Sequence, residues 1–146
     1  MLFGKRKRLV SRILLVEDEP LVAFDNETSM RELGYEIVAT VDRFMDAAAI
    51  LDAQDVDLVL TDVSLAGERT GIDVARYAAG KGVPILFVSG TCPADAGAFA
   101  IGCLAKPYNE RALKNALQAV DRKLGGSNPG KLPPGLIFYA EPEGQG

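Results

Sequence analysis

The sequence predicts an α/β fold of the (βα)5 type, in which a doubly wound parallel sheet carries helices on both faces. Short apolar runs alternate with helical segments along most of the 146 residues, which is the pattern of a mainly parallel sheet. The apolar runs are continuous, as is typical of strands that are buried on both faces. The length fits one domain with a full hydrophobic core.

Local signals place each element in order. Arg12–Val16 is an apolar first strand, and Pro20 opens a helix over residues 21–33 that Gly34 ends, because proline is favoured at the first helical position and glycine just after the last. Alternation with β-branched residues then predicts a strand nearer the sheet edge, and apolar positions at helical spacing predict the helices. The remaining elements expected in chain order are a strand over 35–41, a helix over 43–53, a strand over 58–62, a short helix over 71–79, strands over 84–88 and 101–105, and a helix over 109–124.

The weakest expected element is a fourth helix between residues 90 and 100. That segment has few apolar anchors, and its Gly97 costs about 1 kcal/mol relative to alanine in a helix. We therefore expect the fourth helix to be short or weak.

The chain divides into three parts. Residues 1–11 form a basic N-terminal tail, residues 12–124 the folded domain, and residues 125–146 a Gly/Pro linker with a short apolar C-terminal tail. The apolar run 136–140 is a liability in water. Two interpretations have equal weight: the run packs on this domain or on another chain by adding to a sheet edge, which allows a homodimer, or it is mostly disordered.

Composition excludes several classes of protein. A net charge of −4 favours neither nucleic acid nor an anionic membrane as a partner, and no apolar run approaches the roughly 20 residues that span a bilayer. The basic start lacks the apolar region of a secretory signal, so we expect a cytoplasmic protein. With no histidine in the chain, Ser-His-Asp or Cys-His catalysis and histidine metal sites are excluded. Cys92 and Cys103 are too few for a zinc site and are expected to be reduced, partly buried side chains.

Charged residues stand at the ends of three expected strands. Glu17 and Asp18 follow the first strand, Asp62 ends the third, and Lys106 follows the last. In open α/β sheets, binding sites form outside the carboxyl ends of the strands. If these strands are neighbours, the three carboxylates and the lysine share one crevice. Such a cluster suits a divalent cation and a phosphoryl group.

Four motifs, each closing an apolar strand, fall in register along the chain. They are Val16-Glu17-Asp18-Glu19-Pro20, Leu58-Val59-Leu60-Thr61-Asp62, Phe87-Val88-Ser89-Gly90 and Leu104-Ala105-Lys106-Pro107-Tyr108. Together they resemble the receiver domain of bacterial two-component response regulators, whose fold is flavodoxin-like. The resemblance covers roughly residues 12–124.

The resemblance implies a role for each residue at the strand ends. Asp62 would accept a phosphoryl group, Lys106 would pair with a phosphoryl oxygen, and Ser89 would donate its hydroxyl to the group once formed. Mg²⁺ would be held by Asp18 and Asp62 directly, by the main-chain carbonyl of Ser64, and by Glu17 at least through a bound water. In this family the peptide bond between the lysine and the following proline is typically cis.

The segment between Ser89 and Lys106 departs from the family pattern. Cys103 stands three positions before the lysine, where receivers commonly have an aromatic switch residue, and the segment is shorter than usual by about one helical turn. Phe87-Val88-Ser89-Gly90-Thr91 resembles the Phe-Ala-Thr-Gly segment of stand-alone receivers from alphaproteobacteria, whose fourth helix is reduced or mobile. We therefore expect signalling through ordering of residues 89–99 on phosphorylation.

The resemblance implies a stand-alone response regulator that catalyses only its own phosphorylation and dephosphorylation. Its expected partners are a histidine kinase or histidine phosphotransfer protein, and a downstream protein target unless it acts as a phosphate sink. The expected contact surfaces are helix 21–33 and region 90–124. Two alternatives stay open: a phosphorylation-independent pseudo-receiver, and a small Mg²⁺-dependent phosphatase of the haloacid dehalogenase type, which normally has a second Asp where Ser64 stands.

Overall fold

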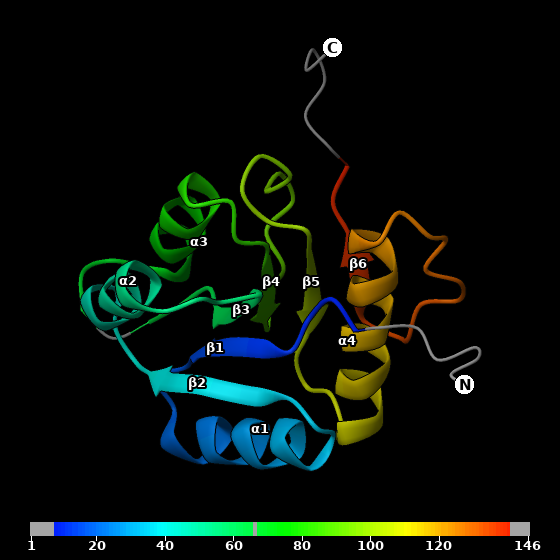
Figure 1. Ribbon diagram of the computed structural model, residues 1–146, viewed down its shortest axis with the longest axis horizontal. Coiled ribbons are helices and arrows are strands. Elements are labelled where there is room, and N and C mark those ends of the chain that lie inside the picture. Colours follow the sequence, from blue (N-terminus) through cyan, green and yellow to red (C-terminus); the bar gives the residue numbers. More distant parts are fainter. Residues whose placement is uncertain (1–7, 66, 141–146) are drawn as a thin grey trace.

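A computed structural model describes residues 8–65 and 67–140 and has one six-stranded sheet with helices on both faces (Figure 1). The strands are β1 (Arg12–Val16), β2 (Glu36–Val41), β3 (Leu58–Asp62), β4 (Ile85–Ser89), β5 (Gly102–Ala105) and β6 (Leu136–Phe138). The helices are α1 (Pro20–Glu32), α2 (Phe44–Ala53), α3 (Gly71–Gly80) and α4 (Glu110–Leu124). The α/β class and the order of elements up to α4 are confirmed, except for the expected fourth helix.

The strand order is β2-β1-β3-β4-β5-β6. The first five strands run parallel, β6 is antiparallel to β5, and β2 lies at the sheet edge as expected. In this register Val16 lies opposite Thr61, and Asp62 lies opposite Val88. The carboxyl ends of β1, β3, β4 and β5 therefore meet at one edge of the sheet, where the charged residues follow.

Two hydrophobic cores lie on opposite faces of the sheet. Alternate residues of β1 show the division: Ile13 and Leu15 belong to the core under α1 and α4, whereas Leu14 and Val16 belong to the core under α2 and α3. Successive side chains of a strand point to opposite faces, so burial on both sides requires a continuous apolar run. No helix in the described part of the chain is long and apolar enough to cross a membrane.

The fourth helix, expected to be short or weak, is reduced further in the structure: residues 90–101 between β4 and β5 contain bends and one turn over 97–99. The Phe99 and Ala100 N–H groups both donate to the Ala96 carbonyl, and the Ile101 N–H donates to the Ile85 carbonyl of β4 at 2.8 Å. Ala96 is fully buried, so the segment is well anchored despite the lack of a helix. A Cβ at Gly97 would overlap the carbonyl oxygen of Ala140. The C-terminal segment thus takes the space beside this connection.

The apolar run near the C-terminus packs on its own domain. Strand β6 pairs with β5, the Ala105 N–H donates to the Gly135 carbonyl at 2.9 Å, and the Tyr139 N–H donates to the Ile101 carbonyl at 3.0 Å. Leu136 and Tyr139 are buried. Of the interpretations of residues 136–140, addition to the edge of this sheet therefore agrees with the structure and disorder does not. The pairing lies within one chain, so covering this strand requires no second copy.

The expectation of reduced cysteines is also wrong for this structure. Cys92 and Cys103 form a disulfide with their Cα atoms 6.0 Å apart. Cys92 lies in the turn region after β4 and Cys103 in the middle of β5. Strands β4 and β5 are parallel neighbours joined by a short connection, so the two cysteines come close together. The number and spacing of two cysteines in the sequence do not predict this pairing.

Candidate functional site

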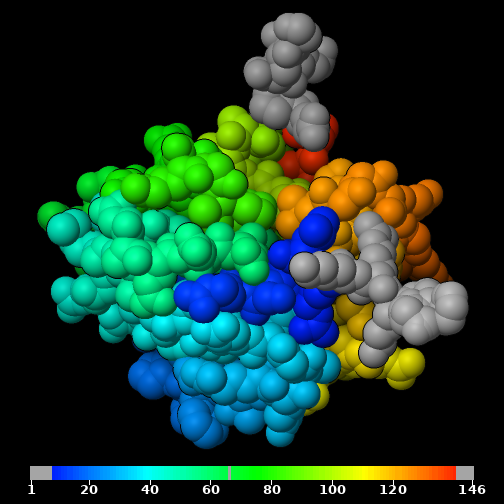
Figure 2. Space-filling model, viewed as in Figure 1, coloured from blue at the N-terminus to red at the C-terminus, as the bar shows by residue number. Residues whose placement is uncertain are grey.

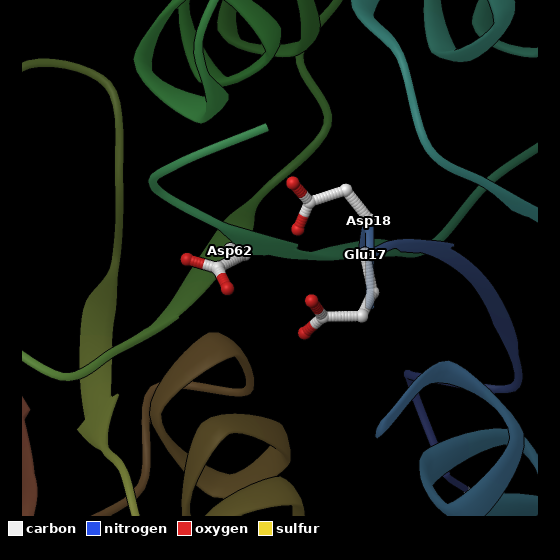
Figure 3. Close-up of side chains that lie close together, drawn as sticks. All are labelled: Glu17, Asp18 and Asp62. Carbon is white, nitrogen blue, oxygen red and sulfur yellow. The ribbon is translucent and has the colours of Figure 1, made fainter. Parts of the chain in front are cut away.

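The acidic residues meet because β1 and β3 are neighbours. Glu17 and Asp18 directly follow β1, Asp62 is the last residue of β3, and Val16 pairs with Thr61 between the two strands. Figure 3 shows the three carboxylates gathered around a common space. One oxygen from each lies within 4.8 Å of those from the other two. The structure therefore brings together three of the residues predicted for the metal site.

These carboxylates fit a hard divalent cation. Magnesium prefers oxygen ligands, and each of the three carboxylates places an oxygen in the same small space. Glu17 and Asp62 are buried, at 2% and 8% exposure, while Asp18 is half-buried. Burial raises the pKa of the Glu17 carboxyl above its usual value. Clustered, poorly hydrated carboxylates are stabilised by positive charge brought among them.

Lys106 supplies positive charge from the end of β5. Its Nζ atom lies 2.6 Å from Asp62 Oδ2 and 3.2 Å from Glu17 Oε1. Its backbone N–H donates to the Ser89 carbonyl at 2.8 Å, which ties this strand end to β4. Partial burial acts to lower the pKa of Lys106, but the hydrogen bond from Lys106 to Asp62 and the charges of Glu17 and Asp62 raise it overall. The lysine is therefore held charged beside Asp62, and the Lys106–Pro107 peptide bond is cis, as in the family.

The two serines predicted for the site, Ser64 and Ser89, make different contacts. The Ser64 N–H donates to Asp62 Oδ1 at 3.1 Å, which orients the carboxylate. The role of its carbonyl as a metal ligand stays a prediction. The buried Ser89 hydroxyl donates to the Thr91 carbonyl at 2.8 Å and accepts from the Thr91 N–H at 3.1 Å. Ser89 thus stands at the expected strand end, and its hydroxyl is engaged by its own loop.

Gly71 shapes the site, although the sequence indicated only a residue at the start of a helix. Its N–H donates to the Val63 carbonyl at 2.7 Å, and a Cβ at this position would overlap the carbonyl oxygen of Asp62. The helix start is set by Thr70, which forms a capping box with Asp73. The sequence does contain one signal for this close approach. A glycine directly follows the helix-capping residue, in the loop that leaves the strand-end aspartate.

A second contact that sequence reasoning missed lies beside the lysine. The buried Asn26 side chain of α1 donates to the Tyr108 hydroxyl at 2.9 Å. Tyr108 follows the Lys106-Pro107 pair, so this bond joins α1 to the connection that carries the lysine. A polar residue at a buried helical position is the only local signal of it.

Comparison with known proteins agrees with this geometry. The family model described as the response regulator receiver domain matches residues 13–118. The transcriptional regulatory protein PdtaR of Mycobacterium tuberculosis is 35% identical over 120 aligned residues, in a match that covers 76% of this chain and 57% of PdtaR. The phyllosphere-induced regulator PhyR of Methylorubrum extorquens is 29% identical over 83 residues, which are 56% of this chain and 31% of PhyR. The matches thus span less than two thirds of either relative's length.

A solved structure carries the same fold. The receiver domain of the sensor histidine kinase PA1611 from Pseudomonas aeruginosa PAO1, which has a magnesium ion in its active site cleft, is 29% identical. The match covers 75% of this chain and 95% of that one, with a TM-score of 0.64. The expected flavodoxin-like receiver fold is therefore confirmed. Because the family model matches more than half of the chain, this protein belongs to the response regulator receiver family.

Proposed function

We propose that this receiver accepts a phosphoryl group on Asp62 from a phosphohistidine of a histidine kinase or a histidine phosphotransfer protein. One observation carries the proposal: at the carboxyl edge of the sheet, Asp62 at the end of β3 meets Glu17 and Asp18, which follow β1, and Lys106, which follows β5. The residues come from three strand ends. A buried aspartate that pairs with a lysine at 2.6 Å is not expected in a chance cluster of surface charges.

The chemistry divides among the residues of the site. An oxygen of Asp62 attacks phosphorus, the bond between phosphorus and the histidine nitrogen breaks, and the imidazole leaves with the electron pair. The Ser64 N–H holds the other carboxylate oxygen, so that one oxygen is oriented for attack. Lys106 balances the charge of the phosphoryl oxygens after transfer. Ser89 donates its hydroxyl to the new phosphoryl group once it gives up its bond to Thr91.

Magnesium is the cofactor that we propose for this step. Asp18 and Asp62 would hold it directly, Ser64 through its main-chain carbonyl, and Glu17 at least through a bound water. When bound, the ion neutralises the charge that develops on the phosphoryl oxygens. The magnesium ion in the PA1611 receiver domain supports this choice.

Helix α1 is the surface that we propose for the phosphoryl donor. Leu21 and Phe24 are 80% and 68% exposed on this helix, which begins three residues after Glu17. Large apolar side chains left in water beside a reaction site favour a protein partner. We propose further that the chain works in the cytoplasm as a single-domain regulator, which contacts a downstream protein or returns the group and serves as a phosphate sink.

Incubation with acetyl phosphate and Mg²⁺ tests the proposal, with intact-protein mass spectrometry as the readout. The expected result is a gain of one phosphate per chain that requires Mg²⁺ and disappears in Asp62→Asn. The matched control is Asp55→Asn, which makes the same change at an exposed position and should leave the gain intact. Release of many phosphates per chain would favour the phosphatase, and no reaction would favour the pseudo-receiver.

A further inference from the structure

The connection between β4 and β5 begins at the candidate site and is tied down close to it. Ser89 ends β4, and its hydroxyl both donates to and accepts from the backbone of Thr91. To donate to a phosphoryl group on Asp62, Ser89 must exchange these bonds for a new one. The ease of that exchange depends on how freely the backbone around Thr91 moves.

The disulfide restrains the residue next to Thr91. Cys92 is linked to Cys103, which is fully buried in β5. Cys103 lies three residues before Lys106, so the bond joins the start of the connection to the strand that carries the lysine. A covalent link to a buried strand limits the displacement of Thr91 far more than local turns do.

The rest of the connection, from Pro93 onward, is held by contacts other than the disulfide. The Tyr139 hydroxyl donates to the Pro93 carbonyl at 2.6 Å, and Tyr139 is itself buried beside β5. Figure 2 shows the C-terminal segment in red against the yellow-green connection. Ala96 is fully buried, and Phe99 packs edge-on against Phe87. Breaking the disulfide therefore leaves residues 94–101 in place and frees only the stretch around Thr91.

We propose that Cys92 and Cys103 form a reversible redox site that controls how readily Ser89 and Thr91 rearrange around a phosphoryl group on Asp62. The coupling rests on the proposed phosphoacceptor function. In the oxidised state the disulfide holds the turn that engages Ser89. In the reduced state the turn is released, and the phosphorylated state gains a hydrogen bond. A disulfide in a reducing compartment is usually transient, catalytic or redox-sensing, which agrees with the proposed cytoplasmic location.

A thiol reductant opens the disulfide in two exchange steps. Cys92 is half-buried and Cys103 fully buried, so an incoming thiolate attacks the sulfur of Cys92. The bond between the two sulfurs breaks, and Cys103 leaves as a thiolate that takes up a proton. A second thiol of the reductant resolves the mixed disulfide, releases the Cys92 thiol and becomes oxidised to a disulfide. Oxidation is the reverse exchange with a small-molecule disulfide such as oxidised glutathione.

The test compares the full chain in its oxidised and reduced states. Alkylation of the unfolded protein should label no thiol after treatment with oxidised glutathione and both cysteines after reduction. Amide exchange of Gly90, Thr91 and Cys92 should be faster in the reduced state, with residues 94–101 unchanged. Beryllofluoride with Mg²⁺ serves as the phosphoryl probe, and its half-saturating concentration should be about fivefold lower in the reduced protein, the effect of one hydrogen bond.

Two variants keep the test specific. Cys92→Ser should bind beryllofluoride like the reduced protein and ignore the redox reagents. Tyr139→Phe removes the bond to Pro93 but keeps the disulfide, so it should retain the redox response. Failure to form the disulfide, or equal exchange of the Gly90, Thr91 and Cys92 amides in both states, overturns the redox site. Equal beryllofluoride affinities overturn the coupling alone, whereas no binding in either state overturns the phosphoacceptor function and the coupling with it.

Discussion

The two halves of the sheet are built in different ways. In the half made of β2, β1 and β3, each strand leads into a helix through a short loop, and the carboxylates lie where the strands end. In the half made of β4, β5 and β6, the connection after β4 has no helix and is held by a disulfide and by a strand from the C-terminal segment. The acidic cluster thus depends on local sequence, whereas the connection beside it depends on contacts between distant residues.

Gly71→Ala disturbs the half of the sheet that holds the acidic cluster. In Gly71→Ala the new Cβ overlaps the carbonyl oxygen of Asp62, so the β3–α3 loop must shift. We expect the free energy of unfolding to fall by about 3 kcal/mol, the upper range for overpacking, as measured by urea denaturation.

Gly80→Ala is the matched control for Gly71→Ala, because it makes the same change in the same helix with nothing near the new Cβ. It should be neutral or slightly stabilising, since alanine favours a helix over glycine. Equal destabilisation by both variants would show that helix content, and not the approach to Asp62, explains the loss.

Lys106 follows β5, in the second half of the sheet. Removing it tests whether its positive charge stabilises the carboxylates of the first half. Lys106→Met leaves the buried Asp62 and Glu17 without their cationic partner. The side chain of Lys106 is 21% exposed, so we expect a loss of about 2 kcal/mol, below the value for a fully buried pair. The measurement is the free energy of unfolding without Mg²⁺, and Lys114→Met on the exposed surface of α4 is the control. A stability equal to that of the control would contradict the electrostatic role.

The third variant disturbs the other half alone. In Gly102→Ala the Cβ overlaps the Ile137 carbonyl oxygen and displaces β6 from β5. We expect a loss of about 1.5 kcal/mol together with faster amide exchange of residues 136–139. Gly90→Ala has open space around its Cβ and should change neither quantity. Loss of stability with unchanged exchange in β6 would mean that the strain is absorbed elsewhere.

The smallest effect concerns one side-chain hydrogen bond between the C-terminal segment and the β4–β5 connection. Tyr139→Phe removes the hydrogen bond to the Pro93 carbonyl and keeps the buried ring. The free energy of unfolding should fall by about 1 kcal/mol, the usual value of one hydrogen bond. Amide exchange of the connection should increase while that of β1 and β3 stays unchanged. A uniform increase over the whole sheet would contradict the separation of the two halves.

Most of the fold could be predicted from the sequence because its signals are local. Continuous apolar runs such as Leu58–Asp62 identify parallel strands, and the residue that ends each run is known from the sequence alone. Parallel strands bring their carboxyl ends to one edge, so the meeting of Asp62 with Glu17, Asp18 and Lys106 was expected if their strands are neighbours, and the strand order of the sheet meets that condition.

The errors lie where distant residues decide the outcome. The missing fourth helix and the Cys92–Cys103 disulfide both depend on packing between the β4–β5 connection, β5 and the C-terminal segment. The position of the Ser89 hydroxyl depends on a turn that no pattern of side chains in the sequence predicts. Each of these involves a choice among several locally acceptable conformations.

The amino-acid sequence is enough to define the order of strands and helices along the chain and to identify the charged residues that follow the strands. The pairing of β6 with the edge of β5, the bond between Cys92 and Cys103, and the close approach of Gly71 to Asp62 are set by packing in three dimensions. The physical reason is range: backbone preference and apolar periodicity act between neighbours in the chain. Disulfides, close backbone approaches and edge pairing require chain segments to be placed in space before they can form.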